Sequence, residues 1–386
     1  MRGRIVAAVP APFNAYLLAL LGAAAWGSRR RPPTNRRPGE LRFAVVVPAH
    51  DEEASLPRTL ASLATLDYPR ALVEIVVIAH NCTDGTARLG ERAGATVWEH
   101  RGERGKGAAL SWGLARVVAE RPDVDAVVVV DADCTVAANL LAALEARLAA
   151  DAAAVQVAYE VSNPGASSTA ALRWASFALI NRVRPLGKDT LGLSAGLLGT
   201  GMAFRRELLA RRPWRARSLV EDQEHHLALV AAGARVTFAP ETRVSSPMPT
   251  SLRRSRTQGL RWDAGRRSLI RRWTPRLLAE GLRRRDPVRL HAGLEPLVPP
   301  QSLLLAANAA AAALALGGSR AARWAGAANL AGQAGFVAGG LALAHAPPAA
   351  WRALAFAPAL AAWKLALLGR LWLHGPPSDW VRTGRD

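Results

Sequence analysis

The stretch Ala126-Val127-Val128-Val129-Val130-Asp131-Ala132-Asp133 decides the fold class. Its run of five apolar residues is typical of a strand that is buried on both faces, as the strands of parallel sheets are. In an extended chain residues i and i+2 point to the same side, so Asp131 and Asp133 can face one hard cation that bridges phosphate oxygens. Aspartates at a strand end are also ordinary turn and N-cap residues, and the pair alone leaves both interpretations open.

Further apolar runs, separated by helical patterns, extend the same sheet. This alternation predicts one doubly wound α/β domain between Leu41 and about Pro249, with a mostly parallel sheet. In such domains ligands lie beyond the carboxyl ends of the strands. The other expected strands are Phe43–Val47, Val73–Ile78, Ala95–Trp98 and Ala154–Val161, and helices are expected near Glu53–Ala64, Gly107–Glu120 and Ala137–Ala149.

Polar residues follow two of these strands. The first strand continues into Pro48-Ala49-His50-Asp51-Glu52-Glu53, and the second into His80-Asn81-Cys82-Thr83-Asp84-Gly85. Side chains at two adjacent strand ends can bind a base and a ribose, although Glu52, Glu53 and Asp84 also fit helix N-termini, where acids favour the dipole. Lys106, in Arg104-Gly105-Lys106-Gly107, opens a helix and fits either a phosphate or nucleobase contact or a simple glycine turn.

Two later motifs can take part in chemistry. Glu221-Asp222 begins the helical stretch Gln223–Ala231, and a carboxylate near a sugar can take a proton from a hydroxyl group. In Gln258-Gly259-Leu260-Arg261-Trp262, the tryptophan offers a flat face for a sugar and the arginine can hold phosphate charge. An N-cap acid pair and an amphipathic helix on a membrane surface explain the same residues, so both alternatives stay open.

Composition limits the class of protein. The 386 residues are 50% hydrophobic, which argues against a disordered chain, and the two cysteines exclude a disulfide framework and a cysteine zinc site. The net charge is +20, and Ser251 to Leu290 alone holds thirteen Arg against three acids, about half of that charge. This basic stretch permits nucleic acid, anionic lipid or a phosphorylated substrate as the partner.

Apolar segments at both ends predict a membrane protein. Ile5 to Trp26 carries no charge over 22 residues, and five Arg follow it by Arg37, so the positive-inside rule places the next domain in the cytoplasm. A cleaved signal peptide is the alternative for this segment. Pro296–Ser319 and Ala325–Ala344 predict two further spans. Ala349–Leu373 fits an interfacial helix or a third span, and this choice decides on which side the C-terminal tail lies.

The ordered motifs VVVPAHDEE (45–53), NCTDGT (81–86), DAD (131–133), LVED (219–222) and QGLRW (258–262) resemble those of membrane-integrated family 2 glycosyltransferases, such as cellulose and hyaluronan synthases and bacterial polysaccharide synthases. The resemblance covers about residues 42–273. It implies a Rossmann-like GT-A domain on the cytoplasmic side of the cell membrane, flanked by N- and C-terminal transmembrane helices. It further implies inverting transfer of a sugar from a nucleotide-diphospho-sugar to a glycan or lipid-linked acceptor.

The resemblance also assigns roles to residues. Asp133 and Asp131 are expected to hold Mg²⁺ or Mn²⁺, and Asp222 to act as the base with Glu221 beside it. The expected donor-binding residues are Pro48, Ala49, Asp51, Glu52, His80, Asn81, Asp84, Lys106 and Asp131; the expected acceptor and diphosphate residues are Gly201, Gln258, Arg261, Trp262, Trp380, Thr383 and Arg385.

The chain departs from the family pattern at several positions. Relatives usually carry Asn where Asp51 stands and Asp where His80 stands, and the latter position contacts the nucleotide. The gating loop of cellulose synthases is absent, while the tail Trp380-Val381-Arg382-Thr383-Gly384-Arg385 is similar to the W-G-T-R element of hyaluronan synthases. A cytoplasmic tail could therefore close over the diphosphate.

We expect four regions: a membrane anchor with a basic linker at 1–40, the GT-A domain at 41–249, an Arg-rich interfacial segment at 250–290 and a C-terminal membrane region at 291–386. The alternative function is a non-catalytic basic membrane protein that binds anionic lipid or nucleic acid. That alternative leaves Asp131, Asp133, Asp222 and Trp262 without a role.

Overall fold

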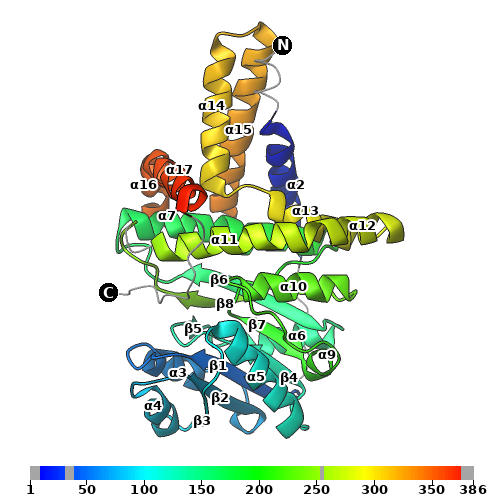
Figure 1. Ribbon diagram of the computed structural model, residues 1–386, viewed down its shortest axis with the longest axis vertical. Helices are drawn as coiled ribbons and strands as arrows, with labels where there is room; N and C mark the ends of the chain where they lie inside the picture. The colour runs from blue at the N-terminus through cyan, green and yellow to red at the C-terminus, as the bar shows by residue number, and fades with distance from the viewer. Residues whose placement is uncertain (1–8, 31–38, 253–255, 375–386) are drawn as a thin grey trace.

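The computed structural model describes residues 9–30, 39–252 and 256–374. Its centre is a mixed eight-stranded sheet with the order β3-β2-β1-β4-β7-β6-β8-β5 (Figure 1). All five strands predicted from the apolar runs are present. The strands are β1 Phe43–Ala49, β2 Val73–His80, β3 Thr96–His100, β4 Ala126–Val129, β5 Thr135–Val136, β6 Ala154–Val161, β7 Met202–Arg205 and β8 Val236–Ser246.

The sheet is mixed, because four of its seven strand pairs are parallel, including β6 with β8, and three are antiparallel. β3, β2, β1 and β4 are parallel, but β7 lies antiparallel between β4 and β6, and β5 pairs antiparallel with β8. The sequence did not reveal β7 because Met202–Arg205 is only four residues long and carries no alternating pattern. This insertion brings the segment before β7, with Gly199 and Thr200, next to the end of β4.

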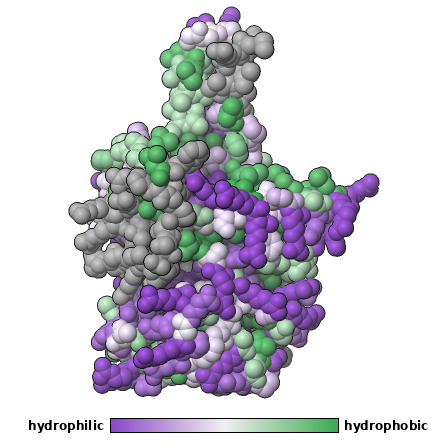
Figure 2. All heavy atoms as spheres, viewed as in Figure 1, coloured by the Kyte–Doolittle hydropathy of each residue, from purple (hydrophilic) through white to green (hydrophobic). Residues whose placement is uncertain are grey.

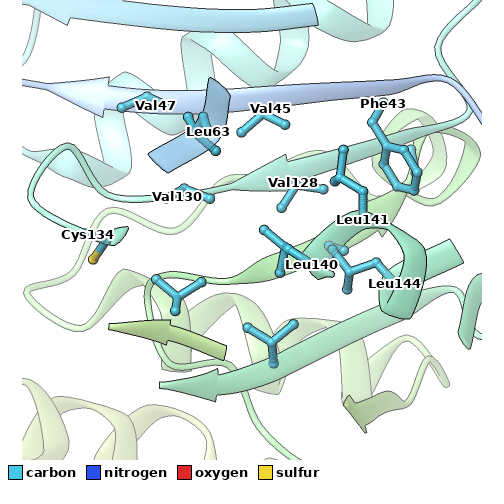
Figure 3. Close-up of a cluster of buried hydrophobic side chains, with 14 of the residues drawn as sticks. Phe43, Val45, Val47, Leu63, Val128, Val130, Cys134, Leu140, Leu141 and Leu144 are labelled. Carbon is cyan, nitrogen blue, oxygen red and sulfur yellow. The ribbon is translucent and has the colours of Figure 1, made fainter. Parts of the chain in front are cut away.

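The sheet has a hydrophobic core on each face. Val45 and Val47 of β1 lie in one buried cluster with Leu140 and Leu144, as Figure 3 shows, whereas Val46 lies in the cluster on the opposite face. Alternate residues of one strand are thus buried on both sides, which is why the run reads as continuously apolar. The packing fixes the strand ends and with them the polar residues that follow.

Helices surround the sheet, and α11 and α12 cross above it (Figure 1). The expected helices at 53–64, 107–120 and 137–149 correspond to α3, α5 and α6. The helices are α2 Ala11–Gly27, α3 Leu56–Ala64, α4 Thr86–Arg92, α5 Lys106–Glu120, α6 Leu140–Ala149, α7 Ser168–Phe177, α8 Arg184–Thr190, α9 Arg206–Arg211, α10 Glu221–Ala231, α11 Arg256–Arg272, α12 Thr274–Arg284, α13 Pro287–Leu294, α14 Gln301–Leu316, α15 Arg320–Leu343, α16 Pro348–Ala353 and α17 Ala357–His374.

Helices α14 and α15 extend away from the sheet domain as an antiparallel pair, with α2 beside α15 (Figure 1). Buried asparagines connect the three helices, because the Asn14 side-chain amide donates to Asn308 Oδ1 at 2.8 Å and to Asn329 Oδ1 at 3.2 Å. Figure 2 shows mainly hydrophobic and near-neutral residues on this pair and hydrophilic residues on the sheet domain. Helix α2 is thereby joined to α14 and α15, which follow it by about 300 residues in the sequence.

Helix α14 is shorter than the predicted span Pro296–Ser319, whereas α15 is longer than the predicted Ala325–Ala344. Pro299 and Pro300 delay the start of α14, and Gly317-Gly318 ends it, because proline lacks a backbone donor and glycine favours a turn. Within the described residues, no single helix has both the length and the hydropathy needed to cross a bilayer. The bent pair Pro287–Leu297 and Gln301–Leu316, whose axes meet at 71°, satisfies both criteria together by length and composition, and Ala11–Gly27 is apolar but short.

Candidate active site

Three candidate metal ligands lie together where β4 ends. Asp131, Asp133 and Cys134 each bring a ligand atom within 4.8 Å of the other two. Burial raises the pKa of the Cys134 thiol well above its usual range, so the thiol stays protonated and the two carboxylates remain as ligands. Carboxylate oxygens suit Mg²⁺ and Mn²⁺. The residues present therefore fit the divalent cation expected from the sequence.

Lys106, the first residue of α5, supplies a positive charge at this place. Its Nζ lies 2.5 Å from Asp131 Oδ1 and 3.9 Å from Glu221 Oε1, and it donates a hydrogen bond of 2.7 Å to the Gly199 carbonyl oxygen. Burial alone would lower the pKa of Lys106, but Asp131 and Glu221 outweigh it, so the pKa is raised and the amine stays charged. The ion pair shows that a positive charge beside the Asp131 carboxylate is stabilised at this position.

Glu221 and Asp222 form the first turn of α10, where the helix dipole favours negative charge. Burial is the largest cause that raises the pKa of Asp222 to about 6, against the opposing effects of the Gln223 backbone N–H and of Lys106. Burial likewise raises the pKa of Glu221, again against Lys106. A carboxylate whose pKa lies near neutrality can accept a proton efficiently. Asp222 therefore has the properties of a general base.

Gly199 separates Asp222 from Lys106. It has a φ of +86°, and a Cβ placed on it would lie 3.5 Å from Asp222 Oδ2 and 3.6 Å from Lys106 Nζ. A larger residue would strain the backbone and would occupy the space between the base and the cation. The glycine thus keeps that space open.

The residues after β1 and β2 line the same cavity, which has a volume of about 1880 Å³. The Asp51 carboxylate, however, accepts hydrogen bonds from the Thr83 and Asp84 backbone N–H groups at 2.7 and 3.3 Å, so it also connects the two loops. Asp84 is not part of the cavity wall, and its oxygens accept from the backbone N–H groups of Thr86 and Glu53. The predicted residues found on the wall are Pro48, Ala49, Asp51, Glu52, His80, Asn81, Lys106 and Asp131.

His80, the departure from the family pattern, is neutral and packed. It is 3% exposed, burial lowers its pKa, and its Nε2 donates to the Glu103 carbonyl oxygen at 2.8 Å. Its ring stacks on His100, which stacks on Trp112 at a centroid distance of 4.2 Å. The buried Nδ1 makes no hydrogen bond within the described structure. His80 thus offers an acceptor atom but no negative charge.

On the opposite side, Trp262 of α11 lines the cavity and packs against Phe177, with 6.4 Å between the ring centroids. Gly201 is not on the cavity wall; it is buried where a Cβ would lie 2.4 Å from Val157 Cγ2, so its role is packing. The side chains of Gln258 and Arg261, and the tail residues Trp380, Thr383 and Arg385, lie outside the described part of the chain.

Several residues of the cavity wall escaped the sequence analysis. In the segment before β7 the sequence indicated only Gly201, and the contact of Gly199 with Lys106 arises because β7 inserts beside β4. Arg173, Arg266 and Lys364, together with Asp263, come from three helices that are far apart in the sequence. The only local signal for Lys364 was that a charge interrupts the apolar stretch Ala349–Leu373.

Comparisons with known proteins agree with this geometry. A sequence profile described as "Glycosyltransferase like family 2" matches residues 38–265. The "Probable glycosyltransferase YdaM" of Bacillus subtilis (strain 168) is 24% identical over 240 residues, 59% of this chain; the match spans only 56% of that relative's length. The solved mannosyltransferase PcManGT from Pyrobaculum calidifontis, in complex with GDP-Man and Mn²⁺, superposes with a TM-score of 0.59 at 22% identity, covering 96% of this chain and 99% of that one. The last likeness establishes a shared GT-A fold.

Proposed function

The chain belongs to glycosyltransferase family 2, and we propose that it transfers a sugar from a nucleotide-diphospho-sugar to a glycan or lipid-linked acceptor with inversion at the anomeric carbon. One observation carries the proposal. Asp131, Asp133, Lys106 and the acid pair Glu221-Asp222 line a single cavity, with Asp222 and Lys106 facing each other across Gly199. A protein that only bound anionic lipid or nucleic acid would have no use for a buried pair of carboxylates there.

The donor binds along the ends of β1, β2 and β4. Residues 48–52, His80 and Asn81 contact the nucleoside, and Lys106 contacts the diphosphate. Asp131 and Asp133 hold Mn²⁺ or Mg²⁺, and the bound cation supplies positive charge for the diphosphate that departs. Lys106 also balances the negative charge of Asp131.

Asp222 activates the acceptor. Its carboxylate takes the proton of the attacking hydroxyl, whose oxygen forms the new bond to the anomeric carbon as the bond to the diphosphate breaks on the opposite face. The nucleoside diphosphate leaves, and the proton remains on Asp222. Trp262 provides an apolar face for the acceptor beside this point.

We further propose that the enzyme works at the cell membrane, with the sheet domain in the cytoplasm. The exposed apolar residues Leu314 and Leu316 on α14 and Trp324 on α15 support membrane contact, because a solvated helix pair would not gain from them. The Arg-rich helices α11 and α12 lie between this pair and the sheet domain, where basic residues would meet anionic lipid (Figure 1).

The experiment that tests the activity is release of nucleoside diphosphate by the purified chain across UDP-, GDP- and TDP-sugars, with Mn²⁺, with Mg²⁺ and with chelator. GDP-mannose with Mn²⁺ is the first donor to try, since the solved neighbour holds that pair. We expect one donor class to be turned over and chelation to abolish release. Absence of both donor binding and release, with native membrane extract present as the source of acceptor, would refute the proposal.

A further inference from the structure

The cavity continues past the acid pair into the membrane-proximal helices, and its far wall is apolar. Leu305 of α14, Leu330 and Val337 of α15, and Leu360 and Trp363 of α17 line this end. None of these side chains can recognise a sugar by hydrogen bonds to hydroxyl groups, except the indole N–H of Trp363. The far end is therefore suited to a hydrocarbon chain.

A cluster of charges separates the apolar end from Trp262. We define the cation cluster as Arg173 of α7, Arg266 of α11 and Lys364 of α17, which surround Asp263. Lys364 Nζ lies 2.6 Å from Asp263 Oδ2, and Asp263 is 7% exposed. Lys364 forms an ion pair with this buried carboxylate, and Arg173 and Arg266 interact with it electrostatically.

The hydrogen bonds of the cluster are incomplete. Arg266 Nε donates to the Pro296 carbonyl oxygen at 2.7 Å, but the buried Nε of Arg173 has no hydrogen-bond partner among the described residues. Burial lowers the pKa of Arg173 and of Arg266, and Asp263 only partly offsets this effect. Buried guanidinium groups in excess over carboxylates are costly unless an anion joins them. Phosphate is the anion that arginine binds best.

The apolar end itself contains one buried polar side chain. Gln333 of α15 is 2% exposed and lines the cavity, yet neither its Nε2 nor its Oε1 has a hydrogen-bond partner in the described structure. A buried amide without partners is rare in folded proteins. Its two polar atoms are available to a ligand that carries a polar group into an otherwise apolar pocket.

Packing ties the cation cluster to the acid pair. A Cβ on Gly265 of α11 would lie 2.6 Å from Val220 Cγ2, so the helix carrying Asp263 and Arg266 rests directly on the residue that precedes Glu221-Asp222. Trp262 also packs against the cluster that contains Val220. The helix that carries Asp263 and Arg266 is thus packed against the start of α10, which carries the proposed base.

We propose that the acceptor is a lipid-linked sugar, that is, a sugar joined through a phosphate or diphosphate to a long-chain alcohol, so that a sugar hydroxyl remains for Asp222 to deprotonate. Its phosphate binds Arg173, Arg266 and Lys364, and its hydrocarbon chain occupies the apolar end between α14, α15 and α17. This inference rests on the proposed function, of which it names the acceptor class. A free phosphorylated sugar would use the cations but would leave the apolar wall in contact with water.

The test compares three probes in one detergent: dodecyl phosphate, dodecanol and methyl phosphate, with retention by the immobilised full chain as the readout. We expect dodecyl phosphate to be retained about tenfold more than either other probe, the size of one charge-assisted hydrogen bond. Arg173→Gln should remove most of this preference, and Arg173→Lys should keep part of it. The matched control is Arg267→Gln, an exposed arginine on α11 that is not part of the cavity wall.

A second variant is expected to increase retention of dodecyl phosphate, and a misfolded protein would not show such an increase. Asp263→Asn removes the one carboxylate of the cluster and should increase retention of dodecyl phosphate while leaving dodecanol unchanged. Equal retention of dodecanol and dodecyl phosphate, or equal losses in Arg173→Gln and Arg267→Gln, would overturn the inference. Equal retention of methyl and dodecyl phosphate would show a free-phosphate site and would overturn it as well.

Donor-dependent nucleoside diphosphate release to water, measured on the same samples, separates the two proposals. If release is intact and the lipid-phosphate preference is absent, only the acceptor inference fails. If the preference is present and no donor binds or turns over, the proposed function fails while the anionic-lipid site stands.

Discussion

The ammonium group of Lys106 lies 2.5 Å from Oδ1 of Asp131, and it also donates to the carbonyl oxygen of Gly199. One lysine thus connects the carboxyl edge of β4, where a cation is expected, to the loop that faces Asp222. In the absence of a donor it partly neutralises a group of carboxylates that would otherwise repel one another. Because Lys106 contacts residues of both loops, we first test how its charge affects binding of the metal and the donor.

Lys106→Gln should strengthen binding of Mn²⁺ to the donor-free protein, by about tenfold, because a competing positive charge beside Asp131 is removed. The same change should raise the KM for the donor, since the diphosphate loses a cationic partner. Calorimetric titration with Mn²⁺ and donor kinetics measure the two effects. A fall in Mn²⁺ affinity in this variant would contradict the placement of the cation at Asp131.

Asp133→Asn should abolish Mn²⁺ binding and reduce nucleoside diphosphate release by at least about 100-fold, as expected when a metal ligand is lost. Asp151→Asn is a suitable control, because Asp151 is an exposed acid in a loop away from the cavity wall. If Asp133→Asn bound Mn²⁺ with the same affinity as the wild type, this result would argue against Asp133 as a metal ligand.

The rate of sugar transfer should fall as the pH is lowered through about 6. The sign follows from burial, which raises the pKa of Asp222 to about 6, and from the requirement that the base be ionised before it can accept a proton. Below that pH the rate should drop by about tenfold per unit for a single ionisation. The measurement is kcat/KM against pH, because this ratio reports the pKa values of the free protein. A rate that stays constant from pH 7.5 to 5 would remove Asp222 from the role of base.

The ionised carboxylate of Asp222 should destabilise the folded protein at neutral pH. A carboxyl whose folded pKa is raised above its unfolded value penalises the folded state once it ionises, and the penalty vanishes as the pH falls toward 4. Asp222→Asn should therefore unfold at a higher temperature than the wild type at pH 7.5, corresponding to about 2 kcal/mol, and the difference should shrink at pH 4.5. Thermal unfolding at the two pH values, followed by circular dichroism, decides this. If the difference in unfolding temperature between the variant and the wild type grew as the pH was lowered, it would contradict a raised pKa of Asp222.

Gly265→Ala should disturb the contact between α11 and the acid pair, since the new Cβ would lie 2.6 Å from Val220 Cγ2. Overpacking of this kind typically costs about 1–3 kcal/mol, and here it should also reduce kcat because it moves Val220. Val220→Ala in the same chain should restore part of both losses by making room. Losses that simply add in the double variant would show that the two residues do not share this contact.

Much of the fold followed from local patterns, and the rest did not. The buried strands β1, β2 and β4 were predictable because both faces are covered, which makes each a continuous apolar run. β7 was not, because a four-residue antiparallel strand is specified by the strands beside it and not by its own sequence. The expected span Pro296–Ser319 proved shorter as a helix, since prolines precede α14 and paired glycines follow it.

The residues of the site also fall into two groups, those that the sequence predicted and those that only the structure brings together. The carboxylates of Asp131, Asp133 and Asp222 stood in motifs whose spacing carries chemical information. The cation cluster had no such motif, because Lys364 and Asp263, which form an ion pair, are 101 residues apart and meet only when α17 packs beside α11. Groups joined by tertiary packing alone cannot be recognised from the spacing of one sequence.

The most direct test of the central claim is single-turnover sugar transfer by Asp222→Asn beside the wild type, with donor and Mn²⁺ affinities measured on the same samples. We predict that the variant binds both ligands with unchanged affinity and transfers sugar at least about 100-fold more slowly, the loss expected for a general base. Transfer at the wild-type rate would contradict the account, because the cavity would then be a donor-binding site whose chemistry does not depend on Asp222.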